Sequence, residues 1–402
     1  MNPPTPSPSA ALLPVEEAQA RLLASVNPLP VQNVPLERAI GRWTGENLTA
    51  RRTQPAATLS AMDGYALRFA DMPGPWRVIG ESAAGAPFTG RVSVGEATRI
   101  FTGAAMPEGT DTVLVQEEAA RDGDRLILAG EGPPYHGRNT RARGLDFHEG
   151  DVLVRRGERL TPARLAVLAT GGHGDAPIAR PVRVALVATG DELVAPGQPA
   201  SGVALPESNR LMLRAMLADL PVETVDLGIL PDRLDVLRDA FGAVDADLLV
   251  TTGGASVGDH DLIRPALEAA GGVIDFWRIA LRPGKPMMAG RMRGTAVLGL
   301  PGNPVSAFVT ALLFVRPLVM RLAGAADPLP SPVAARLGEA LAANGPRTDY
   351  VRAEVRDGMV FASSIQDSSM LLTLARSSCL IVRAPHAPAA AAGDSAEILM
   401  IA

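Results

Sequence analysis

Residues 247–261 read DLLVTTGGASVGDHD, and this stretch decides the class of fold. The apolar run 247–252 is typical of a buried strand, and Gly253-Gly254 ends it before a helix predicted over 260–270. Two other segments repeat the arrangement of an apolar strand followed by a glycine-containing loop: VRVALVATGDEL at 182–193 and TAVLGLPGNPVS at 295–306. A repeated unit of this kind indicates a sheet whose strands are joined by helices.

Strands and helices alternate along the whole chain from residue 181 to residue 326. The predicted strands are 182–188, 223–227, 247–252, 273–279 and 295–300. The predicted helices are 208–220, 232–241, 260–270 and 304–322. This alternation favours a parallel sheet with helices on both faces, and the right-handed crossover rule leaves a doubly wound α/β domain.

The segments on either side of this domain have a different pattern of predicted helices and strands. A helix is predicted at 14–24, and short β-like runs alternate with glycine and proline turns between 51 and 144. A proline-rich linker, 327–332, precedes a β-like region with a predicted hairpin around Asp357-Gly358. The predicted organisation is a disordered tail at 1–10, a β domain at 51–144, an α/β domain at 181–326 and a C-terminal β domain at 327–402.

The composition narrows the classes of function. The chain of 402 residues has a formal net charge of −5, which argues against binding to a nucleic-acid backbone. Its single cysteine, Cys379, excludes an intramolecular disulfide and a thiolate zinc cluster. The most apolar stretch, Val305 to Leu322, is interrupted by Arg316 and Pro317, and we interpret it as too short to span a membrane. With no signal-peptide pattern, we expect a cytoplasmic protein without membrane or nucleic-acid partners.

Three loops follow the carboxyl ends of predicted strands, where open α/β sheets bind their ligands. In the loop 251–261, Gly253 and Gly258 have the spacing of a phosphate-binding loop. Asp259 stands where a Walker A loop has lysine, and the dinucleotide spacing G-x-G-x-x-G is absent. The loop therefore predicts an anion site of another kind.

Four carboxylates lie in two of these loops. Asp259 and Asp261 have an alternative explanation as caps of the following helix. Asp191 and Glu192 come from a different strand end, which weakens that explanation. Because Mg²⁺ binds one or two carboxylates together with substrate phosphates, the pattern points to magnesium.

The loop 300–306 contains Pro301-Gly302-Asn303-Pro304. Asn303 is suited to cap the following helix, and Pro304 to its first position. Pro301 and Gly302 instead favour a tight turn with exposed backbone donors, so a cap alone and a cap within a ligand loop both stay open.

A cationic segment follows the strand predicted at 273–279. Arg278, Arg282 and Lys285 are either a solvated face or a stiff site for an oxyanion, since prolines flank them. Asp63 lies in an Asp-Gly turn of the β region. The five histidines have no zinc spacing and there is no G-x-S-x-G motif, which argues against hydrolysis by zinc or by a serine triad.

Taken in order, several segments resemble the molybdopterin molybdenumtransferase (MoeA-type) family, which is similar to the E domain of gephyrin. The Gly-Gly-x-Ser-x-Gly-Asp and Pro-Gly-Asn-Pro loops are shared with other molybdopterin-binding domains, and Met-Asp-Gly-Tyr-Ala and Arg-x-x-Gly-x-Asp mark this branch. The matching segments are 60–66, 101–104, 111–117, 141–146, 189–193, 251–261, 283–286 and 301–306.

The resemblance implies an elongated homodimer of four-domain subunits, with a discontinuous dimerisation domain at 11–50 and 145–180 and a C-terminal β-barrel-like domain. It implies Mg²⁺-dependent insertion of molybdate into adenylylated molybdopterin with release of AMP. The upstream adenylyltransferase and downstream cofactor-handling proteins are expected partners.

The resemblance also assigns roles to residues of this chain, in a cleft shared between subunits. The implied catalytic residues are Asp63, Asp146, Asp191, Glu192 and Asp259, of which Asp191, Glu192 and Asp259 would bind the metal. The implied substrate-binding residues are Thr102, Thr189, Gly253, Gly254, Ser256, Gly258, Asp261, Pro301, Gly302, Asn303 and Pro304. The implied molybdate-binding residues are Arg278, Arg282, Lys285, Arg352, Ser368 and Ser369.

The chain departs from the family pattern at a few positions. Arg278 and Arg282 stand where lysines are common, Glu207 stands where Asp is usual, and the segment 367–370 lacks a common glycine. Two other functions stay open: molybdopterin adenylyltransferase, and a non-catalytic cofactor carrier or peptide-anchoring scaffold. Tungstate is an alternative to molybdate, because both are tetrahedral dianions of similar size.

Overall fold

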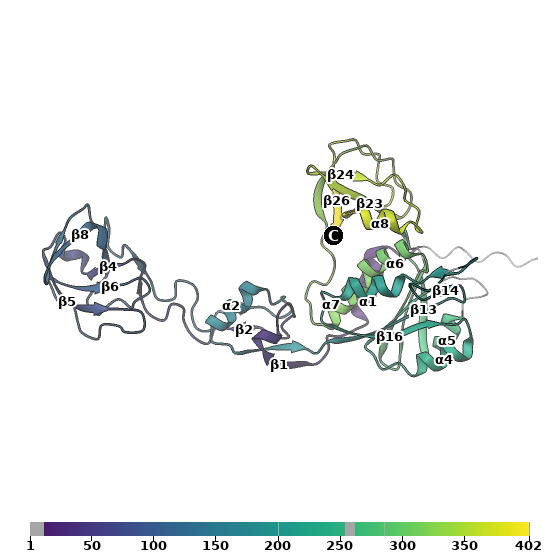
Figure 1. Ribbon diagram of the computed structural model, residues 1–402, viewed down its shortest axis with the longest axis horizontal. Helices are drawn as coiled ribbons and strands as arrows, with labels where there is room; N and C mark the ends of the chain where they lie inside the picture. Colours follow the sequence, from purple (N-terminus) through teal and green to yellow (C-terminus); the bar gives the residue numbers. More distant parts are fainter. Residues whose placement is uncertain (1–11, 200, 254–261, 285, 402) are drawn as a thin grey trace, which may run out of the picture.

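A computed structural model of the chain describes residues 12–199, 201–253, 262–284 and 286–401. The molecule is elongated (Figure 1). A β body that contains β4 (Gly64–Leu67) lies at one end, and a smaller body with α2 (Pro162–Thr170) follows. The α/β body and the C-terminal body lie together at the other end. The tail predicted at 1–10 lies outside the described residues.

The α/β body is built on a six-stranded sheet. Its strand order is β16 (Val222–Leu230), β13 (Val182–Thr189), β17 (Leu248–Thr252), β21 (Thr295–Leu300), β20 (Pro286–Met292) and β18 (Gly272–Arg278). The first four strands are parallel, as the alternating pattern predicts. Strands β13 and β21 consist almost wholly of buried residues, because helices cover both faces of the sheet.

One strand of the sheet departs from the predicted parallel pattern. Strand β20 is antiparallel to both of its neighbours, so the sheet is mixed. The segment Pro286–Met292 was not predicted as a strand, since its Met-Met-Ala-Gly run has weak β propensity. It joins β21 through a two-residue turn in which Arg293 (φ 50°) and Gly294 (φ 95°) are both left-handed, a hairpin turn without the usual Asn-Gly signature.

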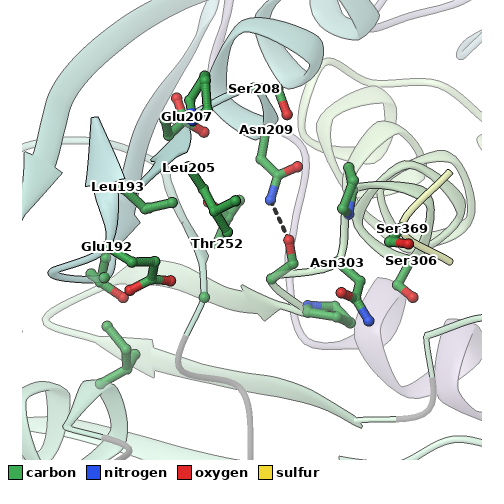
Figure 2. A pocket seen from close by; sticks show the side chains of 18 of the residues that line it. Glu192, Leu193, Leu205, Glu207, Ser208, Asn209, Thr252, Asn303, Ser306 and Ser369 are labelled. Carbon is green, nitrogen blue, oxygen red and sulfur yellow. Dashed lines mark hydrogen bonds between the residues drawn. The ribbon is translucent and has the colours of Figure 1, made fainter. Parts of the chain in front are cut away.

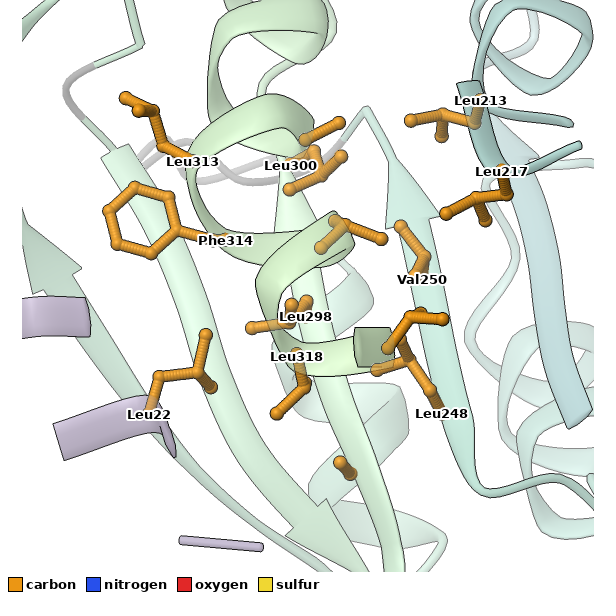
Figure 3. Close-up of a cluster of buried hydrophobic side chains, with 14 of the residues drawn as sticks. Leu22, Leu213, Leu217, Leu248, Val250, Leu298, Leu300, Leu313, Phe314 and Leu318 are labelled. Atoms are coloured by element: carbon orange, nitrogen blue, oxygen red, sulfur yellow. The ribbon is translucent and has the colours of Figure 1, made fainter. Parts of the chain in front are cut away.

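Helices cover the sheet on both sides. The helices are α3 (Asn209–Leu217), α4 (Leu234–Gly242), α5 (Ile263–Ala269), α6 (Pro304–Thr310) and α7 (Arg316–Leu322). One face packs against α3, α6, α7 and the N-terminal α1 (Val15–Ala24), and Figure 3 shows Leu22, Leu298 and Leu318 meeting there. The other face packs against α4 and α5 through Phe241 and Leu267.

The helix predicted at 304–322 is continuous, but its middle turn, Ala311–Val315, is a π-helix. Pro317 lies two residues after this turn and has no N–H to donate to the carbonyl groups of the turn, so the regular backbone pattern is interrupted there. By length and composition Pro304–Leu322 is long enough to cross a membrane, so the expectation that it is too short was wrong. Within the structure 72% of the apolar stretch of this helix is buried, which is typical of a core helix.

The β body is a second six-stranded sheet with a core of its own. Its order is β7 (Thr112–Val115), β4, β6 (Glu96–Ile100), β5 (Trp76–Ser82), β9 (Arg125–Leu128) and β8 (Ala119–Asp122). Two chain segments connect it to the smaller body, and the Gln54 N–H donates to Phe147 O between them at 2.9 Å.

The smaller body combines residues from both sides of this insertion. Strand β1 (Val31–Pro35) pairs with β12 (Asp175–Ala179), and β2 (Leu48–Thr49) pairs with β11 (Val152–Val154). A third pair, β3 (Leu59–Ser60) with β10 (Thr140–Arg141), lies toward the β body.

The C-terminal body is a closed barrel. Its strands are β22 (Val333–Leu337), β23 (Thr348–Arg356), β24 (Met359–Ala362), β25 (Cys379–Arg383) and β26 (Ser395–Met400), with helix α8 (Leu371–Arg376). The pairing of β23 with both β24 and β25 closes the sheet, and Asp357-Gly358 forms the predicted hairpin turn. Strand β19 (Leu281–Arg282) adds to β23, and Tyr350, Leu380 and Leu399 join the core of the α/β body.

Candidate active site

A pocket of about 830 Å³ lies at the carboxyl ends of the parallel strands β13, β17 and β21 (Figure 2). These strands are neighbours in the sheet, so the three predicted loops begin at one edge. The lining residues predicted from the sequence are Thr189, Glu192, Gly253, Pro301, Gly302, Asn303, Pro304 and Ser369. Sheet topology therefore brings together residues more than a hundred positions apart.

Close backbone packing brings the loops together. Gly253 has φ +90°, and a Cβ there would lie 2.6 Å from Thr189 O. A Cβ on Gly302 would lie 3.6 Å from the Gly253 Cα. A side chain at Gly253 would push the first loop away, which explains the need for glycine at this strand end.

One side of the pocket is acidic. Glu192 lines it, and the Asp191 Oδ1 atom accepts a hydrogen bond of 3.1 Å from the Asp232 N–H. Burial and the nearby charges of Asp191 and Glu192 raise the pKa of Asp232. Asp232 also lines the pocket, although the sequence pattern predicts it only as the start of a helix. Its position two residues after strand β16 (Val222–Leu230) was the signal that could have identified it.

The opposite side joins the α/β body to the C-terminal body. The Asn209 Nδ2 atom donates to Gly302 O at 2.8 Å (Figure 2). Asn303 Nδ2 donates to Ser368 Oγ at 3.1 Å, and the Val305 N–H donates to Ser368 O at 3.1 Å. Asn303 occupies the cap position of α6 but makes no capping bond with its side chain. The Asn303 side chain therefore does not cap α6, and a role of this loop in ligand binding stays a prediction.

The predicted cations have different surroundings. Arg278 is exposed, and the Arg282 guanidinium lies 3.0 Å from Asp349 with a side chain that is 56% exposed. Arg352 is only 1% exposed, and its guanidinium donates to the carbonyl oxygens of Asp367 and Met370. The Arg352 guanidinium is thus buried and hydrogen-bonded to the protein, whereas Arg278 and Arg282 are exposed.

Asp63 and Asp146 lie elsewhere. Asp63 precedes β4 in the distal β body, and Asp146 lies in the connection between the bodies, so one chain does not bring either to the pocket (Figure 1). The Asp63 carboxylate accepts from Thr102 N at 2.7 Å and from Thr102 Oγ1 at 2.8 Å. These bonds lower the pKa of Asp63. The Asp146 side chain is exposed, and its N–H donates to Gln54 O at 3.0 Å.

Several predicted residues cannot be placed. Gly254, Ser256, Gly258, Asp259, Asp261 and Lys285 lie outside the described residues. Among the residues that are described, no group of three side chains forms a ready metal site.

The doubly wound sheet, its strand-end pocket and the attached barrel define a multidomain α/β protein with a pocket at the carboxyl edge of its sheet. Three family models match along the chain: the MoeA N-terminal region (domains I and II) at 13–172, a probable molybdopterin binding domain at 185–321 and the MoeA C-terminal region (domain IV) at 334–401. The pocket lies within the second of these segments and is completed by the third.

Similar proteins extend this finding over nearly the whole chain. A molybdopterin molybdenumtransferase of Haemophilus influenzae is 39% identical over 319 residues, covering 78% of each chain. One from Nostoc is 30% identical and covers 95% of this chain and 93% of its own. The crystal structure of the molybdopterin biosynthesis moeA protein of Pyrococcus horikoshii superposes with a TM-score of 0.84 at 25% identity, over 97% of this chain and 100% of that one. The chain belongs to the molybdopterin molybdenumtransferase family, and it is an enzyme of molybdenum cofactor biosynthesis.

Proposed function

We propose that this enzyme inserts molybdate into adenylylated molybdopterin in the presence of Mg²⁺ and releases AMP. The observation that carries the proposal is the pocket itself, in which described residues from three strand ends lie beside a wall from the C-terminal body. Backbone donors at glycine-rich turns suit a pyrophosphate, and the exposed Arg282, two positions before the pocket-lining Gly284, suits a second anion. The proposal includes a cytoplasmic location and the domain boundaries expected from the sequence.

Asp191 and Glu192 would hold Mg²⁺ together with Asp259, which lies outside the described residues. The electrostatics of the pocket support this choice, because the pKa of Asp232 is raised partly by two neighbouring negative charges. Such crowding is relieved by a cation. When bound, Mg²⁺ would neutralise the charge of the pyrophosphate and polarise it.

The chain's own residues position two anions. Thr189, Gly253 and Gly302 form a turn-rich cradle for the nucleotide part of the substrate. Arg278, Arg282, Lys285, Ser368 and Ser369 are the proposed molybdate residues. Nothing in this set requires a protein nucleophile. Catalysis would rest on orientation and charge compensation.

The proposal includes a homodimer with a shared cleft. Within one chain, Asp63 and the pocket lie at opposite ends of the molecule (Figure 1). If Asp63 and Asp146 act in catalysis, they must reach the pocket of a second copy. A closed two-fold arrangement would then create two equivalent sites.

The test uses purified protein with adenylylated molybdopterin and Mg²⁺, with and without molybdate, and measures AMP release. We expect release that depends on molybdate and is lost in Asp191→Asn. Tight binding without AMP release would indicate a carrier, and formation of the adenylylated pterin from ATP would indicate an adenylyltransferase. Replacing molybdate with tungstate measures the preference between the two oxyanions.

A further inference from the structure

The turn that carries Asp63 is held from several directions within the distal β body (Figure 1). The buried Ser60 hydroxyl donates to Met62 O at 2.5 Å and accepts from Met62 N at 3.3 Å, so it closes the turn on itself. Gly64 then begins strand β4, where an added Cβ would clash with Leu114 O. The backbone after Asp63 therefore packs directly against the neighbouring strand.

Arg99, near the end of strand β6, contacts this turn through two of its donor atoms. Its NH1 atom donates to Gly64 O at 3.0 Å, and its NH2 atom donates to Gln116 Oε1 at 2.7 Å. The Gln116 N–H in turn donates to Asp63 O at 3.1 Å. One guanidinium therefore binds the residue after Asp63 and also holds the residue whose backbone binds Asp63.

Two aromatic rings hold this guanidinium in place. Arg99 lies opposite Tyr65 in the pairing of β6 with β4, and its Cζ atom lies 5.2 Å from the centroid of the Tyr65 ring. The centroid of the Phe101 ring lies 4.7 Å from the same atom. A planar guanidinium can stack on rings and still donate in two directions, whereas a lysine ammonium cannot reproduce this arrangement.

The Asp63 carboxylate is held separately from its backbone. Thr102 donates to it from both N and Oγ1, and the two donor atoms of Arg99 are used on Gly64 and Gln116 instead. The hydrogen bonds of Arg99 therefore act on the turn. Asp63 itself remains half-exposed, so its carboxylate is able to meet another molecule.

We propose that Arg99 is a positioning residue for Asp63, which fixes the turn from which the carboxylate reaches the pocket of a second copy. The inference rests on the proposed function, in which Asp63 acts in catalysis. The turn lies at the far end of an elongated molecule, so its rigidity has to come from its own neighbours (Figure 1). A displacement of about 1 Å at a reacting group can reduce the rate on the order of 100-fold.

The test compares Arg99→Lys and Arg99→Gln with the controls Arg91→Lys and Arg91→Gln, at an exposed position of the same body that pairs with Glu108. We expect kcat for AMP release to fall on the order of 10-fold in both Arg99 variants, with the KM for adenylylated molybdopterin within about twofold of wild type. The controls should behave as wild type.

Two kinetic results would overturn the proposal. A wild-type kcat in Arg99→Lys would mean that a positive charge alone is sufficient, without the stacked and forked geometry. A raised KM with an unchanged kcat would mean that Arg99 contributes to substrate binding and not to the placement of Asp63.

A double-mutant cycle tests whether Arg99 acts through Asp63. If it does, Arg99→Lys reduces the residual activity of Asp63→Asn by less than roughly threefold. If the separate effects multiply, Arg99 acts independently of Asp63, and the proposal is wrong.

Hydrogen exchange supplies a readout that needs no turnover. The Thr102 and Gln116 amides both donate to Asp63, and we expect both to exchange faster in the Arg99 variants, with an unchanged rate in strand β9 of the same body. Unchanged exchange at both amides would contradict the proposal even if activity fell. Faster exchange throughout the body would contradict it too, because Arg99 would then support the whole fold. If the wild-type protein shows no molybdate-dependent release of AMP, the proposed function fails, while exchange still decides whether Arg99 holds the turn.

Discussion

The carboxylates at the two ends of the molecule have opposite electrostatic environments. At the distal end, Asp63 accepts two hydrogen bonds from Thr102, and its pKa is lowered. At the pocket, burial and the charges of Asp191 and Glu192 raise the pKa of Asp232. The distal carboxylate is stabilised as an anion by its own chain, whereas burial and neighbouring charges disfavour the anion of Asp232. The difference teaches that similar residues can have separate tasks, because hydrogen bonds hold one as an anion and the surroundings of the other oppose its charge.

The largest expected effect separates these two tasks. We expect Asp191→Asn and Asp63→Asn each to reduce AMP release on the order of 100-fold or more. Only Asp191→Asn should also raise the Mg²⁺ concentration needed for half-maximal activity, because only Asp191 belongs to the proposed metal site. Titration of activity with Mg²⁺ measures this. Asp235→Asn, an exposed position paired with Arg233, is the control and should behave as wild type. An unchanged Mg²⁺ requirement in Asp191→Asn would contradict the assignment of Asp191 to the metal site.

The next prediction tests whether the two ends meet in a dimer. Chains with Asp63→Asn and chains with Asp191→Asn are mixed and allowed to exchange. In a shared cleft, each heterodimer contains one site with both substitutions and one intact site. We therefore expect activity to recover to roughly one quarter of wild type. The mixture would stay inactive if each chain contained a complete site, and the same chains kept unmixed supply the baseline.

A smaller effect concerns the pH dependence at the distal end. Thr102→Val removes the Oγ1 donor and keeps the backbone donor, so the pKa of Asp63 rises toward its ordinary value. If Asp63 acts as an anion, the acidic limb of the profile of kcat/KM against pH moves to higher pH. Carboxyl NMR of Asp63 measures the pKa directly. Thr58→Val, an exposed position nearby in the chain, should leave both measurements unchanged.

The smallest expected effect is on stability at the pocket. Because the folded-state pKa of Asp232 is raised, its protonation contributes stability at acidic pH, and this contribution is lost as pH rises through the folded pKa. In chelator-treated protein at pH 7, Asp232→Asn removes the repulsion and should raise Tm by about 1–3 °C. At pH 3 the two proteins should melt together. A lower Tm for the variant at pH 7 would mean that the charge of Asp232 makes favourable interactions in the folded protein, which contradicts the prediction.

The α/β architecture could be predicted from the sequence because its strands carry strong signals. The runs 182–188, 247–252 and 295–300 are apolar and end in glycine-containing loops, and they form the parallel centre of the sheet. Strand β20 was missed, because its side chains have weak strand propensity and its turn uses Arg293 at a left-handed angle. The sequence of a segment does not show whether another strand of the folded protein will pair with it.

The candidate site was predictable only in part. Loop composition indicated Glu192, Gly253 and Asn303, and the sheet brings them together. Asp232 follows a strand but has no glycine-rich neighbours, so composition did not mark it. The buried state of Arg352 depends on carbonyl groups of a loop more than ten residues away, which no spacing rule reports. The functional roles of these residues remain predictions.

The pairing of early and late segments has a consequence for how the chain is made. Strand β1 at Val31–Pro35 needs β12 at Asp175–Ala179, and helix α1 packs in a core that includes Leu399. The distal β body contains its own contiguous core, and it can fold while the ribosome is still synthesising its host. The N-terminal helix, by contrast, is the first element translated and among the last to find its partners. Until then its apolar face is either exposed to solvent or covered by chaperones. The rate of synthesis and the supply of chaperones should therefore affect the yield of this enzyme more strongly than the stability of the folded protein does.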